Sequence, residues 1–292
     1  MLETGGWSDY ALLDSGHGRK LERYGGITVV RPEEQAIWAP RLDERTWNAA
    51  DAEFTGNTDE EGAGRWKARG KLPESWVMAY ESLRFEGRFT SFRHVGVFPE
   101  QVVHWQWFSD LIAKATSGAG RPVRVLNMFG YTGLASLVAA SAGAHVTHVD
   151  ASKKAIEWAR RNQALSGLED RPIRWICDDA VKFAAREVRR GNAYDGIILD
   201  PPKYGRGPKG EVWHLFEGLP GLLDDCRALV SDTPLFFILT AYSIRSSFLT
   251  LHEVMADRFA DRGLLESGEL VLRGLDGGRR LSTSLFTRWS NP

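Results

Sequence analysis

The sequence has little cysteine, no excess of either charge and no long hydrophobic run, and each shortage excludes a class of protein. Its 292 residues include two cysteines, Cys177 and Cys226, which permit at most one disulfide and form no metal-ligand cluster. Lysine and arginine number 37 and aspartate and glutamate 38, so any contact with a polyanion must come from a local patch. No apolar stretch is long enough to span a bilayer.

The first residues also lack the features of a targeting signal. Residues 1–6 contain neither a basic flank nor an apolar run, so we expect no signal peptide and no membrane anchor. With so little cysteine, this predicts a reducing, cytoplasmic location and no bound metal. Hydrophobic residues at 43% and charged residues at 26% are typical of a folded chain with a substantial core.

The first third of the chain is rich in tryptophan, glycine and short alternating segments. Residues 27–30, 76–80 and 83–89 are predicted to be strands, and residues 56–62 a polar turn. We therefore interpret residues 1–94 as a small β-rich domain. Its tryptophans are typical of core packing rather than of a platform on which bases stack.

From residue 95 onward, strands and helices alternate. Pro99 fits the first turn of a helix whose apolar residues recur at helical spacing. Strands are predicted at residues 124–129, 145–150, 173–177, 196–200, 235–239, 269–272 and 284–289, with helices between most of them. Residues 95–292 are therefore predicted to form an α/β domain, a doubly wound, mostly parallel seven-stranded sheet of Rossmann-like type. The last two strands would supply an antiparallel edge.

The first three strands of this domain each end in residues suited to an adenosine-containing ligand. The first strand runs into a turn whose glycines allow close approach of backbone to ligand and whose amides open a helix. The second ends in Asp150, from which a carboxylate can bind ribose hydroxyls, and the third ends in Asp178-Asp179, where a carboxylate can accept from an adenine amino group. The candidate ligand-binding residues are Asn127, Phe129, Gly130, Tyr131, Thr132, Gly133, Asp150, Ala151, Ser152, Asp179 and Ala180.

Each of these sites also has a purely structural interpretation. The turn can be a plain strand-to-helix connection, and an aspartate at a strand end can be a helix N-cap, although Ser152 is well placed for that task after Asp150. A dinucleotide site would require G-x-G-x-x-G, which the turn does not provide. Three such sites on successive strand ends favour the adenosine ligand.

The most specific pattern follows the fourth strand. Residues 196–199 run into Asp200-Pro201-Pro202-Lys203-Tyr204, where the two prolines stop both helix and strand and fix the loop in an extended form. A rigid carboxylate and carbonyl can accept hydrogen bonds from an amino group of a planar substrate, and Tyr204 can stack on its face. We predict that these five residues form the catalytic site, with Asp200 also next to the cofactor.

These motifs resemble those of class I S-adenosylmethionine-dependent methyltransferases. Within them the match is closest to the large-subunit ribosomal RNA cytosine methyltransferase family and its bacterial relatives, which carry an L-N-x-F-x-Y-T-G turn; here Phe129, Tyr131 and Gly133 occupy its later positions. Residues 95–101 resemble the entry to that family's catalytic domain, whose glutamine, here Gln101, helps to bind the cofactor. The resemblance covers about the last two hundred residues. It implies S-adenosylmethionine as cofactor and RNA, with ribosomal RNA first, as partner.

One departure from that family concerns the chemistry. Methylation at carbon five of cytosine requires an attacking thiolate, which the family places just after the fifth strand, where this sequence has Thr240-Ala241-Tyr242-Ser243. We interpret Cys177 and Cys226 as structural. The sequence therefore predicts methyl transfer to a nitrogen or another acceptor, which needs no covalent catalyst because positioning supplies most of the acceleration.

Other functions remain open at this stage. A methyltransferase acting on a small molecule or a protein and a catalytically silent RNA-binding assembly factor are alternatives; a nicotinamide dehydrogenase is disfavoured by the missing third glycine. The basic segment 273–280 can contact phosphates or be a solvated turn, and His94 and His104 are typical of packed rather than catalytic histidines.

Overall fold

The computed structural model describes residues 1–56, 64–118, 121–242, 244, 246–260 and 263–291. Their contacts separate two compact units, Met1–Val102 with Leu270–Thr283, and Val103–Glu269 with Ser284–Pro292. The expected domain boundary between residues 94 and 95 stays a prediction. The division into units differs from it because Leu270–Thr283, in the carboxyl-terminal hairpin, groups with the first unit. The turn expected at residues 56–62 lies, apart from Gly56, outside the described residues.

The first unit is β-rich, as expected. One sheet has the order β2 (Tyr10–Gly16), β3 (Arg19–Tyr24), β4 (Ile27–Pro32), β5 (Ala52–Gly56) and β6 (Gly64–Ala68). Its neighbours are antiparallel except for β4 and β5, which are parallel because α1 (Glu44–Asn48) lies on the connection between them. Strands β7 (Ser75–Tyr80) and β8 (Leu83–Arg88) form a separate ribbon. The sequence predicted β4, β7 and β8 but not the other four.

A buried polar cluster lies inside the first sheet. The guanidinium of Arg31 donates to both carboxylate oxygens of Glu22, at 2.7 and 2.8 Å, and both side chains are buried. The hydroxyls of Tyr10 and Tyr24 donate to Oε1 of the same glutamate at 3.0 and 2.9 Å. The charge of Glu22 is therefore paired and hydrogen-bonded, as burial of a carboxylate requires.

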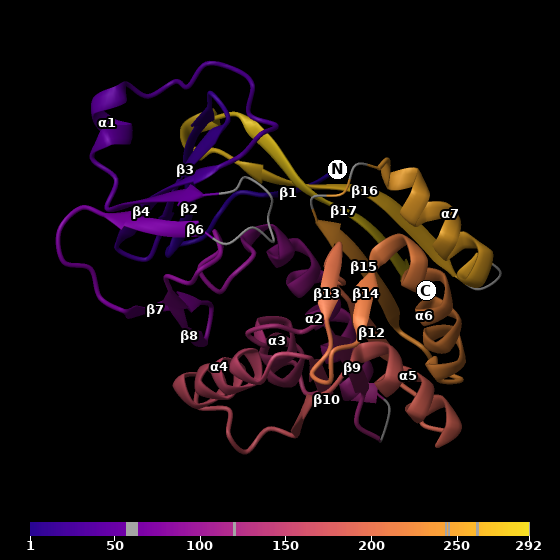
Figure 1. Ribbon diagram of the computed structural model, residues 1–292. Helices are drawn as coiled ribbons and strands as arrows, with labels where there is room; N and C mark the ends of the chain where they lie inside the picture. Colours follow the sequence, from indigo (N-terminus) through magenta and orange to yellow (C-terminus); the bar gives the residue numbers. More distant parts are fainter. Residues whose placement is uncertain (57–63, 119–120, 243, 245, 261–262, 292) are drawn as a thin grey trace. The chain divides into compact units, whose positions relative to one another are not determined.

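The second unit contains most of a large, mostly parallel sheet, whose strand β1 and residues Leu270–Thr283 group with the first unit (Figure 1). Its order is β1-β16-β17-β15-β12-β9-β10-β11, with β1 (Leu2–Thr4), β16 (Leu264–Arg273), β17 (Arg280–Ser290), β15 (Phe236–Tyr242), β12 (Gly196–Leu199), β9 (Arg124–Met128), β10 (His145–Asp150) and β11 (Ile173–Cys177). Its helices are α2 (Val102–Gly118), α3 (Leu134–Ser141), α4 (Lys153–Leu165), α5 (Ala180–Arg189), α6 (Leu215–Leu229) and α7 (Phe248–Phe259). The doubly wound fold is confirmed.

Two details of the sheet differ from the prediction. It has eight strands rather than seven, because Leu2–Thr4 pairs in parallel with Leu270–Leu272 of β16. A three-residue strand is too short to show a period of its own. The expected antiparallel strand is β17, which runs against β15, but it lies inside the sheet and β1 forms the edge.

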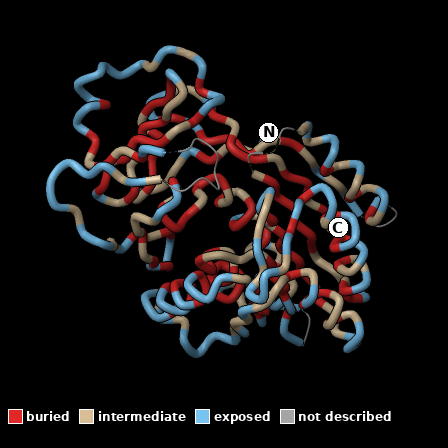
Figure 2. The backbone as a smooth tube through the Cα atoms, viewed as in Figure 1, coloured by how far each residue is buried: buried red, intermediate tan, exposed pale blue. Residues whose placement is uncertain are grey.

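Successive side chains of a strand point to opposite faces of the sheet, so the hydrophobic core lies on both faces. In β15, Phe237 packs on Phe259 of α7, whereas its neighbour Phe236 stacks on Phe108 of α2. Side chains of α5 and α6 join the first of these clusters, which contains Phe183 and Leu222. Figure 2 shows the central strands as buried between the exposed surfaces of the helices. Apolar runs in β9 and β12 follow from burial on both faces.

Candidate active site

The strand order changes direction between β9 and β12, and in sheets of this type ligands bind at such a switch point, outside the carboxyl ends of the strands. Met128 is the register partner of Leu199, so the segments that follow these residues leave the sheet side by side. One segment is the turn from Phe129 to Gly133 and the other is the loop that begins at Asp200. The structure thus brings the predicted cofactor turn and the predicted acceptor loop together.

The turn after β9 has a backbone that needs its glycines. Phe129 and Tyr131 have left-handed φ angles of 56° and 50°, and Gly133, the N-cap of α3, has φ 82°. A Cβ added at Gly130 would lie 2.3 Å from the His148 ring, and one at Gly133 would lie 2.8 Å from Ala159. The glycines therefore let the turn pack closely on His148 and Ala159. Its backbone N–H groups lie at the amino terminus of α3, where a helix can bind a polar or anionic ligand.

A buried polar network supports this turn from below. Asn127 and His148 both bond to the hydroxyl of Ser136, each at 2.9 Å, and the three side chains are fully buried. Burial lowers the pKa of His148 to about 3, so its ring is neutral. Sequence reasoning missed His148 and Ser136. Asn127 acts here as a supporting residue, and its direct contact with the cofactor stays a prediction.

Asp150 connects two successive turns at the strand ends. Its Oδ2 accepts from the backbone N–H of Tyr131 and its Oδ1 from that of Ser152, both at 2.8 Å. Burial raises the pKa of Asp150, and these two hydrogen bonds oppose the rise. The N-cap of α4 is Ser152, whose hydroxyl accepts from Ala155 N at 3.2 Å, so the carboxylate is not used as the cap. Its predicted contact with ribose hydroxyls stays a prediction.

The two aspartates that follow β11 make different contacts. Asp179 is the N-cap of α5 and accepts from Lys182 N at 2.9 Å, and Ala180 is the buried first residue of that helix. Asp178 accepts from Arg186 at 2.6 Å, while its backbone N–H donates to the Asp150 carbonyl at 3.1 Å. The predicted adenine contact of Asp179 and Ala180 stays a prediction beside these structural contacts.

The acceptor loop is fixed at both of its ends. Asp200 follows β12, and its Oδ1 accepts a short hydrogen bond from the hydroxyl of Thr240 on β15. Pro201 is buried and Pro202 exposed, and the Pro202 carbonyl accepts from the indole N–H of Trp213 at 2.8 Å. Lys203 is exposed, and its carbonyl accepts from Leu215 N at 3.0 Å. Two prolines and these bonds make the loop rigid.

Trp213 is a residue that sequence reasoning missed. It is 5% exposed, and its ring lies 5.3 Å from the ring of Phe129 in the cofactor turn. It belongs to a short hairpin of β13 (Tyr204–Arg206) and β14 (Val212–His214), in which the predicted stacking residue Tyr204 pairs with His214. The turn residues Pro208 and Gly210 between two short alternating segments were the signal for this hairpin.

Both thiols have surroundings that disfavour a nucleophile. Cys226 is fully buried in α6, and burial raises its pKa well above the usual value. Partial burial, followed by the charges of Asp150 and Asp178, raises the pKa of Cys177, whose Sγ contacts the Ala151 carbonyl at 3.6 Å. At the expected thiolate position, Ala241 is buried in β15; Ser243 lies outside the described residues.

Other sequence candidates have structural surroundings of their own. His104 is 1% exposed and packs edge-on against Phe286, as expected for a packed histidine. In the basic segment, Arg279 lies over the Trp38 ring and Arg280 pairs with Glu3 at 3.1 Å. Gln101 ends the short 3-10 helix η1 (Pro99–Gln101) in the first unit, and its contact with a cofactor stays a prediction.

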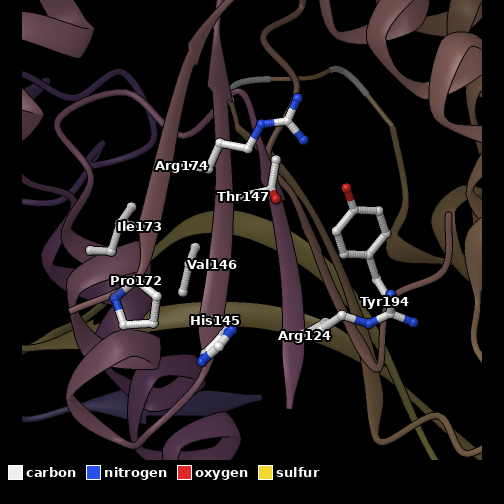
Figure 3. A pocket seen from close by; sticks show the side chains of 8 residues that line it. All are labelled: Arg124, His145, Val146, Thr147, Pro172, Ile173, Arg174 and Tyr194. Atoms are coloured by element: carbon white, nitrogen blue, oxygen red, sulfur yellow. The ribbon is translucent and has the colours of Figure 1, made fainter. Parts of the chain in front are cut away.

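A hollow of about 340 Å³ lies at the opposite edge of the sheet. Figure 3 shows Arg174 at one end of the lining side chains, and Arg124 and His145 at the other. The residues that line it lie at the starts of β9, β10 and β11, with Tyr194 just before β12, whereas the candidate site lies where these strands end. The hollow is therefore separate from the crevice of the cofactor turn. Among the described residues, no cluster suited to a metal ion and no helix that could cross a membrane is found.

Comparison with known proteins identifies the family. The family profile of S-adenosylmethionine-dependent methyltransferases matches residues 49–229. The chain belongs to the S-adenosylmethionine-dependent methyltransferase family. A crystal structure of such a methyltransferase from Agrobacterium tumefaciens is 56% identical, with a TM-score of 0.94 over 100% of this chain and 93% of that one.

Two curated relatives of the methyltransferase carry more specific names. Ribosomal RNA large subunit methyltransferase K of Neisseria meningitidis is 24% identical over 253 residues, which are 82% of this chain and 66% of that protein. Ribosomal RNA large subunit methyltransferase I of Shewanella amazonensis is 42% identical over 90 residues, or 30% of this chain and 23% of that protein. The methyltransferase thus spans less than two thirds of the length of these relatives.

The residues present fit S-adenosylmethionine, the cofactor of this family. Gly130 and Gly133 let the turn pack against His148 and Ala159, and its backbone N–H groups at the start of α3 would be the donors for the cofactor. Asp150, at the end of the next strand, offers the carboxylate that ribose hydroxyls require. Asp200 lies on the other side of the switch point, where the acceptor would meet the methyl group.

Proposed function

We propose that the methyltransferase acts on RNA, with ribosomal RNA as the first candidate, and modifies a nitrogen or oxygen atom rather than carbon five of cytosine. The observation that carries this proposal is the rigid loop from Asp200 to Tyr204 beside the cofactor turn, with Thr240 and Ala241 where a thiolate would be required. The cytoplasmic location expected from the sequence belongs to the same proposal.

The geometry supports transfer by positioning alone. S-adenosylmethionine would supply the methyl group on a sulfonium: the acceptor's lone pair would form the new bond to carbon, the electron pair of the C–S bond would leave with sulfur, and the acceptor's proton would pass to solvent. Thr240 fixes one oxygen of Asp200, and Trp213 fixes the Pro202 carbonyl. Asp200 and the Pro201 carbonyl then orient the acceptor amino group toward the methyl carbon, which is the contribution that in-line transfer needs most.

The names of the relatives support an RNA acceptor. The aromatic ring of Tyr204 supports an acceptor with a planar ring, such as a base. Tyr204 follows the loop directly and is half-buried, and a tyrosine beside the acceptor supports stacking on a base. A small-molecule or protein acceptor would need a closed pocket or a peptide groove instead. An assembly factor without activity would have no use for an acceptor loop of this rigidity.

The test of the acceptor class is a transfer assay with labelled S-adenosylmethionine. Ribosomal RNA from cells that lack the gene, total protein from the same cells and their small-molecule extract are incubated separately with the enzyme. We expect label in the RNA fraction. Label only in protein or in the small-molecule extract would contradict the proposal and leave the family assignment intact.

A variant of the acceptor loop tests the role of Asp200. Asp200→Ala removes the orienting carboxylate but no contact of the cofactor turn, so turnover should fall about a hundredfold with nearly unchanged affinity for S-adenosylhomocysteine. Asp232→Ala, an exposed aspartate before β15, is the matched control and should behave as wild type. Lost cofactor affinity with normal turnover at saturation would show that Asp200 serves the donor instead.

A further inference from the structure

The β13–β14 hairpin has one buried and one outward face. Its register pairs Tyr204 with His214 and Arg206 with Val212, and these four side chains share a face because strand residues alternate. Trp213 points the other way, toward Pro202 and Phe129. Figure 1 shows the hairpin beside the carboxyl-terminal ends of the central strands. Its outward face therefore begins directly after the acceptor loop.

Contacts at both ends fix this hairpin to the second unit. Trp213 bonds to the Pro202 carbonyl at its base, and Leu215 N donates to the Lys203 carbonyl at 3.0 Å. At the tip, Glu211 forms an ion pair of 2.6 Å with Lys182 of α5 and accepts from Lys209 N. A hairpin fixed in this way keeps its outward side chains in place without a ligand.

The outward face and tip carry uncompensated positive charge. Arg206 and Lys209 are exposed, and within the described part of the chain neither side chain forms an ion pair. The one carboxylate of the hairpin, that of Glu211, is already neutralised by Lys182. Next to these cations lie the rings of Tyr204 and His214, 5.1 Å apart, and Val212, which is 56% exposed. The net charge of the chain is −1, so this is a local patch.

We propose that the outward face of the β13–β14 hairpin binds the RNA backbone next to the methylated nucleotide. Arg206 and Lys209 contact phosphates, and the Tyr204–His214 pair stacks on the base that enters the acceptor loop. Cations beside aromatic rings are the combination by which proteins bind single-stranded nucleic acid. This inference rests on the proposed RNA acceptor and names the part of the chain that contacts it.

The test is the binding of a single-stranded RNA that the wild-type enzyme methylates, measured by fluorescence anisotropy at several salt concentrations. Arg206→Gln with Lys209→Gln should weaken binding about tenfold and reduce the slope of log K against log salt by about 1.4, for two phosphate contacts of about 0.7 each. Lys154→Gln with Arg160→Gln removes two exposed cations of α4 and makes the same change in net charge. This control should keep nearly the wild-type affinity and slope.

The outcomes separate the two proposals. Methylation of RNA by the wild type, with the hairpin variant and the control equally affected, would overturn the role of the hairpin and leave the RNA acceptor in place. If the wild type neither binds nor methylates RNA, the proposed function fails and the hairpin proposal with it. Unchanged affinity of the hairpin variant for S-adenosylhomocysteine is expected, because the hairpin cations make no contact with the cofactor turn.

Discussion

At the scale of single residues, Asp150 has the largest expected effect on the cofactor. Each of its oxygens accepts one backbone N–H, from Tyr131 and from Ser152, so the carboxylate fixes the turn in which we expect the ribose to bind. The side chain of Asp150→Asn has one acceptor oxygen, whereas both oxygens of Asp150 accept a hydrogen bond. Affinity for S-adenosylhomocysteine should therefore fall at least about tenfold in calorimetric titration.

Asp170→Asn is the matched control for Asp150, because Asp170 is an exposed aspartate between α4 and β11. It should bind S-adenosylhomocysteine as the wild type does. A normal affinity of Asp150→Asn would mean that this carboxylate has no part in cofactor binding.

The two cysteines provide a second test at this scale. Both thiols have raised pKa values and neither lies at the position of the family's nucleophile, so they are protonated at neutral pH. Cys177→Ser with Cys226→Ser should keep most of the methyl-transfer activity, with about 1 kcal/mol lost from the free energy of unfolding. An enzyme trapped covalently on RNA that contains 5-fluorocytosine would contradict this assignment.

At the scale of elements, the β13–β14 hairpin fixes the acceptor loop through Trp213. Trp213→Phe retains a ring that packs on Phe129 but loses the donor to the Pro202 carbonyl. Because a net hydrogen bond contributes about 1 kcal/mol, kcat/KM for the acceptor should fall about fivefold. Cofactor affinity and melting temperature should change little.

Trp107→Phe, on α2, is the control for this substitution and should leave kcat/KM unchanged. If Trp213→Phe loses cofactor affinity and acceptor turnover together, Trp213 supports the whole site rather than the loop.

The sequence predicted the elements whose residues show a clear period or a clear break. The strand ends at Asp150 and Asp200 were located because apolar runs stop there, and the structure brings their turns together at the switch point. The strands β13 and β14 have three residues each, and β1 has three as well, so none shows a period. His148 and Ser136 could not be found because their contact depends on the packing of α3 on β10.

The sheet of the first unit depends on its buried ion pair. Arg31→Met leaves the carboxylate of Glu22 buried without its partner, which should cost about 3–5 kcal/mol of the free energy of unfolding in denaturant titration. Arg19→Met removes a partly exposed arginine whose guanidinium lies 3.5 Å from the Glu44 carboxylate, and should cost about 0.5 kcal/mol or less. Equal losses in the two variants would show that Arg31 and Glu22 do not stabilise each other.

The same pair predicts how stability depends on pH. Burial alone would raise the pKa of Glu22, but Arg31 and Lys20 lower it from 4.5 to about 2. A carboxylate with a lowered pKa in the folded state stabilises the protein above its unfolded pKa. The free energy of unfolding of the wild type should therefore fall as the pH is lowered from 4.5 to about 2, and Arg31→Met should show a weaker fall.

At the scale of the whole molecule, the two ends of the chain meet in one sheet. Leu2–Thr4 pairs with β16, and β17 pairs with β15 next to the strand that leads to Asp200. The chain has a net charge of −1, so RNA cannot be attracted by the molecule as a whole. Recognition of the proposed RNA acceptor must therefore come from local groups, and we expect the acceptor loop and its hairpin to supply them.

The central claim is that this methyltransferase modifies RNA without a covalent thiol adduct, and the identity of the methylated nucleoside tests it most directly. Ribosomal RNA from cells lacking the gene is treated with the enzyme and S-adenosylmethionine, digested to nucleosides and analysed by mass spectrometry. We predict a nucleoside methylated on nitrogen or oxygen whose rate of formation falls about a hundredfold when Asp200→Ala is used. Detection of 5-methylcytidine as the product would contradict the account.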